Sequence, residues 1–203
     1  MRYLGHMSSE AITAVTDLGE RRRNRRQEET IQKVLDAAVE LLRESSYSDL
    51  TMRTVAAQAG VAPATAYTYF SSKNALIAEV YLRLVREVPL FTDVNQTTQQ
   101  RVTAQLRELA LLVADEPELA AATTTALMGD EPDVRHVRDK IGMEVRRRIA
   151  SALGPGAWPE VLTTLEMIFY GALVRAGTKS MSYYQMADQL DSVIALIMGG
   201  AEW

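Results

Sequence analysis

The 203-residue chain contains no cysteine and only two histidines. Without cysteine there is no disulfide framework, no thiol nucleophile and no thiolate ligand for a metal ion, which fits a reducing cytoplasm. Neither His6 nor His136 has a second histidine at helical spacing, so the sequence contains no recognisable zinc site. We therefore expect no metal and no cofactor.

Long apolar runs are also absent. No run reaches the roughly 18 residues that a membrane-spanning helix needs, and the N-terminus lacks the continuous apolar segment of a secretion signal. We expect a cytoplasmic protein with no membrane partner. Residues 1–7 are left out of the functional reasoning, because Gly5-His6-Met7 is equally typical of a cloning remnant and of a native sequence.

Signatures of catalysis are missing as well. The chain has no glycine-rich phosphate loop. Its two Asp-Glu-Pro stretches, at 115–117 and 130–132, stand at expected helix starts, where acidic residues favour the helix dipole. We assign no catalytic residue and expect that the protein is not an enzyme.

The charge that is present divides unevenly along the chain. Residues 1–75 hold 10 Lys and Arg against 9 Asp and Glu, whereas residues 76–203 hold 12 against 17. The net charge of −4, which alone argues against a nucleic-acid partner, therefore belongs to the C-terminal part. Within the N-terminal part, residues 21–26 (RRRNRR) form a compact basic block.

Hydrophobic spacing predicts an all-α chain with no strand. From Glu28 to residue 42, apolar residues recur every three or four positions, which is typical of an amphipathic helix. Thr51 is a suitable cap for a second, short helix that Gly60 ends, and Pro63 stands near the start of a third. A fourth helix stops at Pro89, and the remainder predicts a larger helical bundle.

The two short helices on either side of Gly60 match the helix-turn-helix plan. In that plan the second helix enters the major groove and the first crosses the DNA backbone. Small residues at 62–64 would let the second helix approach the bases closely, and Lys73 would add a cation near the phosphates. The basic block at 21–26 could reach phosphates or a minor groove. Similar helices also occur in proteins that bind no DNA, so spacing alone leaves the function open.

The residues themselves resemble a known family. The stretch LTMRTVAAQAGVAPATAYTYFSSKNALIAEV, at 50–80, closely resembles the DNA-binding domain of TetR-family transcriptional regulators. The matching positions are Thr51, Ala56, Gly60, Val61, Thr65, Tyr67, Tyr69, Phe70, Ser72, Lys73 and Leu76. Ala66 departs from the pattern, since the family usually has leucine at this position, which packs into the core of the small domain.

The resemblance implies a role for individual residues. The implied contacts to base edges are Arg53, Pro63, Ala64 and Tyr67. Arg53 is the best candidate for reading a guanine, because its guanidinium suits O6 and N7, while Tyr67 could instead be a packing residue. The implied phosphate contacts are Thr51, Thr65, Tyr69 and Lys73.

The resemblance also implies three segments: a flexible arm at 1–20, a three-helix helix-turn-helix domain at 21–75, and a helical bundle for ligand binding and dimerisation at 76–203. The last two helices are apolar on most sides, so each must be buried all round. A partner subunit would provide that burial, and a homodimer matches a palindromic operator. The alternative is a pair of helices deeply buried within a monomer.

Methionine and aromatic residues of the C-terminal part favour an elongated apolar ligand over a charged one. The candidate ligand-binding residues are Phe91, Met128, Met143, Met167, Phe169 and Tyr170. Threonines 123–125 could supply hydroxyl groups to the same pocket. Each of these residues, taken singly, is equally typical of a core.

We interpret the chain as a repressor that an apolar effector releases from a palindromic operator. It looks like the subgroup that governs lipid and sterol catabolism, so the effector would be a lipid, an acyl-CoA or a sterol-like molecule. The arginines at 146–148 could meet a CoA phosphate, or could form a solvated helix face. The alternative function is an apolar small-molecule binding protein that keeps a vestigial DNA-binding domain.

Overall fold

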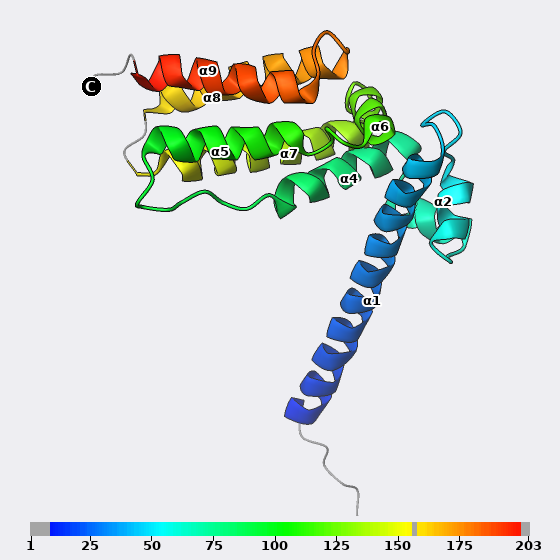
Figure 1. Cartoon of the computed structure of the whole chain (residues 1–203). Helices are drawn as coiled ribbons and strands as arrows, with labels where there is room; N and C mark the ends of the chain where they lie inside the picture. Colours follow the sequence, from blue (N-terminus) through cyan, green and yellow to red (C-terminus); the bar gives the residue numbers. More distant parts are fainter. Residues whose placement is uncertain (1–8, 156–157, 200–203) are drawn as a thin grey trace, which may run out of the picture.

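The computed structural model describes residues 9–155 and 158–199, with side chains from Asn24 onward, and this part of the chain consists of helices and connecting loops, with no strand (Figure 1). Its helices are α1 (Ser9–Glu44), α2 (Met52–Gln58), α3 (Pro63–Tyr69), α4 (Lys73–Glu87), α5 (Thr98–Leu111), α6 (Pro117–Leu127), α7 (Pro132–Leu153), α8 (Pro159–Gly177) and α9 (Tyr183–Gly199). The prediction of an all-α chain is confirmed. Among the described helices, none is both long and apolar enough to cross a membrane.

Local sequence signals set most of the helix boundaries. Proline is the first residue of α3, α6, α7 and α8, where its missing N–H costs no hydrogen bond. Thr51 and Ser72 cap α2 and α4 by accepting hydrogen bonds from backbone N–H groups, each at 3.1 Å. Gly60 ends α2 with φ of +67°, a conformation that glycine adopts without strain. The N–H groups of Gly60 and Val61 then bond back to the carbonyls of Ala57 and Ala56, which completes the helix end.

The first helix differs from its prediction. Residues 1–8 of the expected arm lie outside the described residues, but from Ser9 the backbone is already helical. Helix α1 therefore starts well before Glu28, where the apolar spacing begins, and it projects away from the body of the molecule (Figure 1). The sustained apolar spacing from Glu28 predicts only the part of the helix that has a buried face.

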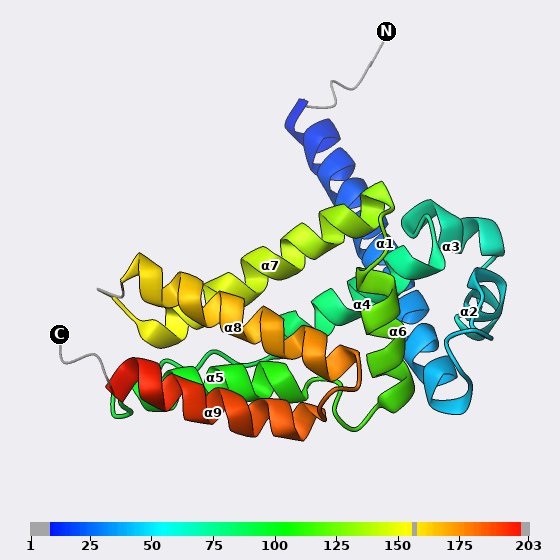
Figure 2. The ribbon, with the colours of Figure 1, turned by 90° about the horizontal axis from the view of Figure 1, so that it is seen from above.

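The helices form a small N-terminal unit and a larger bundle. Helices α1, α2 and α3 pack together, and α4 leads from them into the bundle. Helices α5, α7, α8 and α9 run along one another, while α6 crosses their end next to the N-terminal unit (Figures 1 and 2). One continuous core joins the two parts, from Val55 and Phe70 in the first to Leu106 and Ile149 in the second. Ala66 is fully buried in this core, so the position does pack inward as the resemblance implies.

Candidate functional site

Helix α3 turns one face to solvent. Its only buried residue is Ala66, and Phe70 at its C-terminal end is buried as well. Pro63, Ala64 and Tyr67 are all exposed, and their spacing of three and four places them on one side of the helix. Arg53 is exposed on the first turn of α2. The four residues with implied base contacts are therefore accessible from outside.

The residues with implied phosphate contacts are more engaged within the chain. The Thr51 hydroxyl caps α2, and Thr65 and Tyr69 are half-buried. Lys73 donates a hydrogen bond from Nζ to the backbone oxygen of Tyr47 at 2.8 Å, and the same atom lies 4.1 Å from the centre of the Tyr47 ring. A phosphate contact by Lys73 would compete with both of these interactions, and this role stays a prediction.

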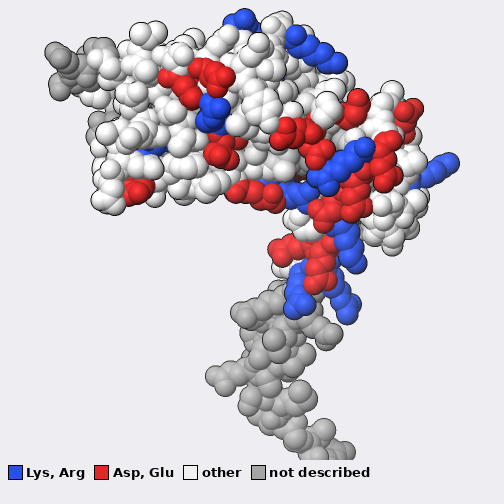
Figure 3. Space-filling model, viewed as in Figure 1, with Lys and Arg blue, Asp and Glu red and all other residues white. Residues whose placement is uncertain are grey.

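The basic block at 21–26 is described only in part. The side chains at 21–23 lie outside the described residues, and the Arg25 guanidinium pairs with Glu29 at 2.9 Å. Figure 3 shows acidic and basic side chains next to one another along α1, with no continuous basic field on that face. On the face shown, single cations rather than a broad basic patch are available for a polyanion.

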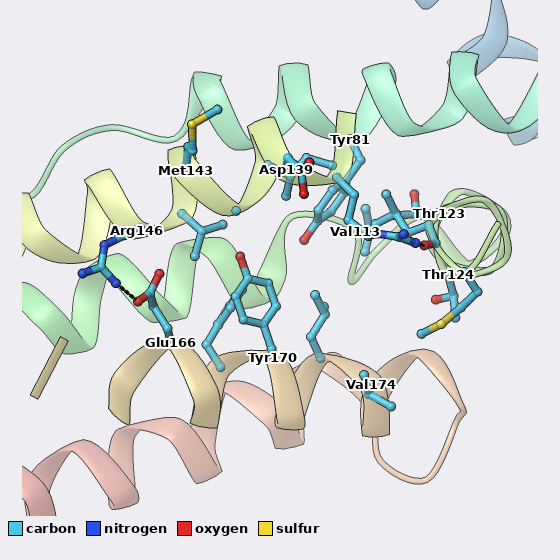
Figure 4. Close-up of a pocket in the computed structure, with 18 of the residues that line it drawn as sticks. Tyr81, Val113, Thr123, Thr124, Asp139, Met143, Arg146, Glu166, Tyr170 and Val174 are labelled. Carbon is cyan, nitrogen blue, oxygen red and sulfur yellow. Dashed lines mark hydrogen bonds and ion pairs between the residues drawn. The ribbon is translucent and has the colours of Figure 1, made fainter. Parts of the chain in front are cut away.

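A second feature is a cavity of about 600 Å³ inside the bundle (Figure 4). Side chains from α4, α6, α7 and α8 line it, together with Tyr183 from the start of α9. Most of the wall is apolar, and hydroxyl groups are supplied by Tyr81, Tyr170, Tyr183, Thr123 and Thr124. A volume of this size suits a small organic molecule, for which pockets of about 300–1,000 Å³ are usual.

Four of the six candidate ligand residues line this cavity: Met128, Met143, Phe169 and Tyr170. Phe91 lies outside it, half-buried in the loop between α4 and α5, where its N–H donates to the Gln105 side chain at 3.5 Å. Met167 also lies outside it and is 71% exposed, because it sits about a quarter turn of α8 away from the cavity-facing residues. A ligand contact by Phe91 or Met167 therefore has no support from the cavity's geometry.

The sequence analysis missed Tyr81 and Tyr183, which reach the cavity from helices far apart in the chain. Burial raises the pKa of the Tyr81 phenol and that of Tyr183. Burial, with a smaller effect from the charge of Glu166, raises the pKa of Tyr170 to about 12. All three phenols are therefore protonated at neutral pH and able to donate hydrogen bonds.

The arginines at 146–148 form a solvated face only in part, because Arg146 and Arg147 are exposed whereas Arg148 is buried. Arg146 pairs with Glu166 at one end of the cavity (Figure 4). Arg147 pairs with Glu144 at 2.7 Å. Arg148 is only 2% exposed; it pairs with Glu144 at 3.1 Å and donates to the backbone oxygens of residues 85 and 86 at the end of α4. Arg148 therefore satisfies carbonyl groups that the end of a helix leaves unpaired.

Exposed apolar side chains lie on α8 and α9, away from the cavity. Met167 on α8 is 71% exposed and Leu196 on α9 is 76% exposed, and neither lines the cavity. In contrast, Leu165 and Phe169 of α8 are fully buried against their own subunit. The apolar character of α8 thus has two sources, an inner face in the core and an outer face towards solvent.

A set of hydrogen bonds joins the N-terminal unit to the bundle beside the cavity; we call Tyr47, Asn74 and Glu131 the junction network. The Tyr47 hydroxyl, in the loop before α2, donates to Oδ1 of Asn74 on the first turn of α4. Nδ2 of Asn74 donates to Glu131 at 2.7 Å, and Glu131 immediately precedes α7. Glu131 lies three residues after Met128, so the network begins next to the cavity wall.

Comparisons with known sequences agree with these features. Residues 34–80, from α1 to α4, match the family model described as bacterial regulatory proteins, tetR family. The chain is 62% identical over 181 residues to an uncharacterized HTH-type transcriptional regulator of Mycobacterium bovis, which covers 88% of this chain and 85% of that protein. It is 25% identical over 205 residues to the HTH-type transcriptional repressor KstR of Mycolicibacterium smegmatis, over 97% of this chain and 98% of that protein.

Solved structures share the arrangement of the helices. A TetR transcriptional regulator from Rhodococcus sp. RHA1 superposes with a TM-score of 0.73 and 21% identity, over 86% of this chain and 97% of that chain. Thermus thermophilus FadR, a TetR-family repressor solved in complex with lauroyl-CoA, gives a TM-score of 0.63 and 18% identity, over 85% and 95% of the two chains. Likeness at these identities shows that the fold is shared.

Proposed function

Because this chain belongs to the tetR family of bacterial regulatory proteins, we propose that it is a repressor that binds a palindromic operator as a homodimer and is released by an apolar small molecule. The observation that carries this proposal is the presence, in one chain, of an exposed face on α3 and a cavity of about 600 Å³ in the bundle. A repressor that is controlled by a small molecule needs a surface that binds DNA and a separate site whose occupancy can change the affinity for DNA.

The exposed face of α3 supports the DNA-binding part of the proposal. Pro63, Ala64 and Tyr67 would meet base edges in the major groove, and Arg53 would reach a guanine from α2. The small side chains at 63 and 64 let the start of α3 come close to the base pairs. Contacts to the DNA phosphates would fix the position of the protein along the duplex, and the residues expected to make them are Thr51, Thr65, Tyr69 and Lys73.

The uncovered apolar face of α8 and α9 supports the dimer. Pairing two copies about a two-fold axis would bury Met167 and Leu196 of each subunit against the same face of the other. Two subunits would present two copies of α3 to half-sites one helical turn apart, about 34–36 Å along the DNA. Not every apolar residue of α8 belongs to this interface, because Phe169 lines the cavity of its own subunit.

The cavity supports control by an apolar effector. KstR, a relative over nearly the full chain, carries the name of a repressor, and FadR, a neighbour in fold, holds lauroyl-CoA. We infer that an effector in this cavity shifts the segment from Met128 to Glu131, and that the junction network carries the shift to Asn74 and the loop before α2. The effector would then select a conformation in which the two α3 helices no longer fit successive major grooves.

The test is a titration of fluorescent DNA from the region upstream of the protein's own gene, followed by anisotropy, with scrambled DNA as the control. We expect the upstream DNA to bind at least a hundredfold more tightly than scrambled DNA at physiological salt, since specific sites typically exceed non-specific ones by about 10³ or more. Equal affinity for both, with apolar probes still bound in the cavity, would favour the alternative of a small-molecule binding protein with a vestigial DNA-binding domain.

A further inference from the structure

Two hydroxyl groups in the cavity wall have no hydrogen-bond partner among the described residues. They are Oγ1 of Thr123 on α6 and the phenol of Tyr170 on α8, and both oxygens are buried. Figure 4 shows Tyr170 reaching from α8 into the middle of the cavity, with Thr123 on the α6 side. Buried polar groups are rarely left unpaired, because removing them from water is costly. The wall is therefore prepared for a ligand that brings polar atoms to these two points.

The charged groups of the wall do not offer a site for an anion. The described lining residues include two cations, Arg138 and Arg146. Arg138 donates to the backbone oxygens of Leu127 at 2.6 Å and Gly129 at 3.2 Å, and Arg146 is paired with Glu166. The wall also contains the acidic residue Asp139. The two acidic lining residues, Asp139 and Glu166, balance the two cations, so the wall carries no net charge to attract a carboxylate or phosphate, whereas an uncharged molecule needs none.

The remaining hydroxyls act as neutral groups too. Tyr183 is hydrogen-bonded to Thr124, and Tyr81 reaches the same space from α4. Protonated phenols donate to an oxygen atom and accept from a hydroxyl, so they suit both a ketone and an alcohol.

We propose that the effector is an uncharged oxygenated lipid, with a hydroxyl or ketone oxygen bound by Tyr170 or by Thr123, and that it is not a fatty acid or an acyl-CoA. This inference rests on the proposed function, in that it specifies the ligand of the same cavity. A hydrocarbon body contacts the apolar wall, and a ligand oxygen pairs with a buried hydroxyl at one or both of these points. Specificity follows, because a ligand without that oxygen leaves both groups unpaired.

The test compares ligands that share one chain length. Decane, 1-decanol, 2-decanone, decanoate and decanoyl-CoA are each titrated into the full chain, without DNA, to displace the neutral fluorescent dye N-phenyl-1-naphthylamine. We expect decanol or decanone to bind at least tenfold more tightly than decanoate and decanoyl-CoA. Tighter or equal binding of decanoate or decanoyl-CoA would overturn the proposal.

Variants identify the groups that bind the oxygen. Tyr170→Phe or Thr123→Val, whichever removes the hydroxyl that binds the oxygen, should lower the affinity for decanol about fivefold, the value of one ordinary hydrogen bond, and both should leave the affinity for decane unchanged. The matched controls are Tyr184→Phe on α9 and Thr125→Val on α6, two exposed residues outside the cavity, and neither should alter the affinity for any of the five compounds. Unchanged decanol binding by both cavity variants would overturn the assignment of these residues.

The outcomes also separate this inference from the proposed function. Because the titration contains no DNA, loss of operator binding cannot influence it. If none of the five compounds displaces the dye, both the effector class and the cavity as an effector site are overturned. If decanoyl-CoA binds best, the cavity remains the effector site and only the uncharged class is wrong.

Discussion

The sharpest consequence of the structure concerns Asn74, whose side chain alone connects Tyr47 to Glu131. Asn74→Ala removes the acceptor for the Tyr47 hydroxyl and the donor to the Glu131 carboxylate. A hydrogen bond to a charged group contributes about 1.5–3 kcal/mol and a neutral one about 0.5–1.5 kcal/mol. Since both bonds are only partly buried, we expect the free energy of unfolding to fall by about 2 kcal/mol, or a Tm lower by roughly 4–8 °C.

The more informative quantity is the coupling between effector and DNA. Such coupling is typically about 1–3 kcal/mol. In the proposed function, the effector lowers operator affinity by a certain factor. If the junction network carries the coupling, Asn74→Ala should make this factor about ten times smaller, a change of about 1.4 kcal/mol. The assay is anisotropy of labelled operator at rising concentrations of whichever decyl compound binds the cavity most tightly. Affinity for that compound without DNA should stay unchanged.

A matched control is Gln105→Ala. Gln105 is also an amide with two hydrogen bonds, to the backbone of Phe91 and Pro89, but it lies within the bundle and away from the junction network. It should lower the Tm without changing the ratio of affinities. If Asn74→Ala lowers the Tm and leaves the ratio intact, as Gln105→Ala does, the junction network only stabilises the fold and the coupling runs elsewhere.

Further predictions follow from single side chains. Leu196→Glu should give a monomer by sedimentation velocity and abolish tight operator binding; a dimer that persists would contradict the proposed interface. Arg148→Met should lower the free energy of unfolding by about 2–4 kcal/mol in urea titrations, because it leaves buried carbonyls unpaired. The bond from Arg147 holds the pKa of Glu144 below its usual 4.5, so this carboxylate stabilises the fold above that pH and the effect disappears as the pH falls through the lowered pKa; Glu144→Gln should flatten the acid limb of the stability curve. Lys73→Ala should make the salt dependence of operator affinity shallower by about one unit per half-site if Lys73 leaves Tyr47 to bind a phosphate; an unchanged slope would mean that it does not touch the DNA.

Helix boundaries could be predicted from the sequence because they depend on local chemistry. Pro63, Thr51, Gly60 and Ser72 act within one turn of their own position, and each has the role that its side chain or backbone suggests. The start of α1 could not be predicted in this way. Ile12, Val15 and Leu18 recur every three positions, but this run is short and a strongly charged stretch follows it, so the helix start is visible only in the structure.

The cavity could be predicted only in part, because its wall is a product of packing. Met128, Met143, Phe169 and Tyr170 line it as expected of methionine and aromatic residues. Met167 is also a methionine, but it lies on a side of α8 that does not face the cavity. Which side of α8 faces the cavity depends on how α7 and α9 pack against it. Similarly, Arg148 differs from its two arginine neighbours only because the end of α4 lies against it.

The tight packing after α6 explains how a change in the cavity could reach the DNA-binding unit without being absorbed on the way. Leu127 and Met128 line the cavity, and the next residue, Gly129, has no room for a side chain: a Cβ there would collide with the Glu131 carboxylate and lie 3.0 Å from the Ala126 oxygen and 3.3 Å from Nδ2 of Asn74. Arg138, itself part of the wall, holds the backbone oxygens at 127 and 129. In the proposed coupling, a ligand that displaces Arg138 would free these backbone oxygens and shift the backbone that leads to Glu131. Since Glu131 is bonded to Asn74, the shift would arrive at the first turn of α4, five residues after the end of α3.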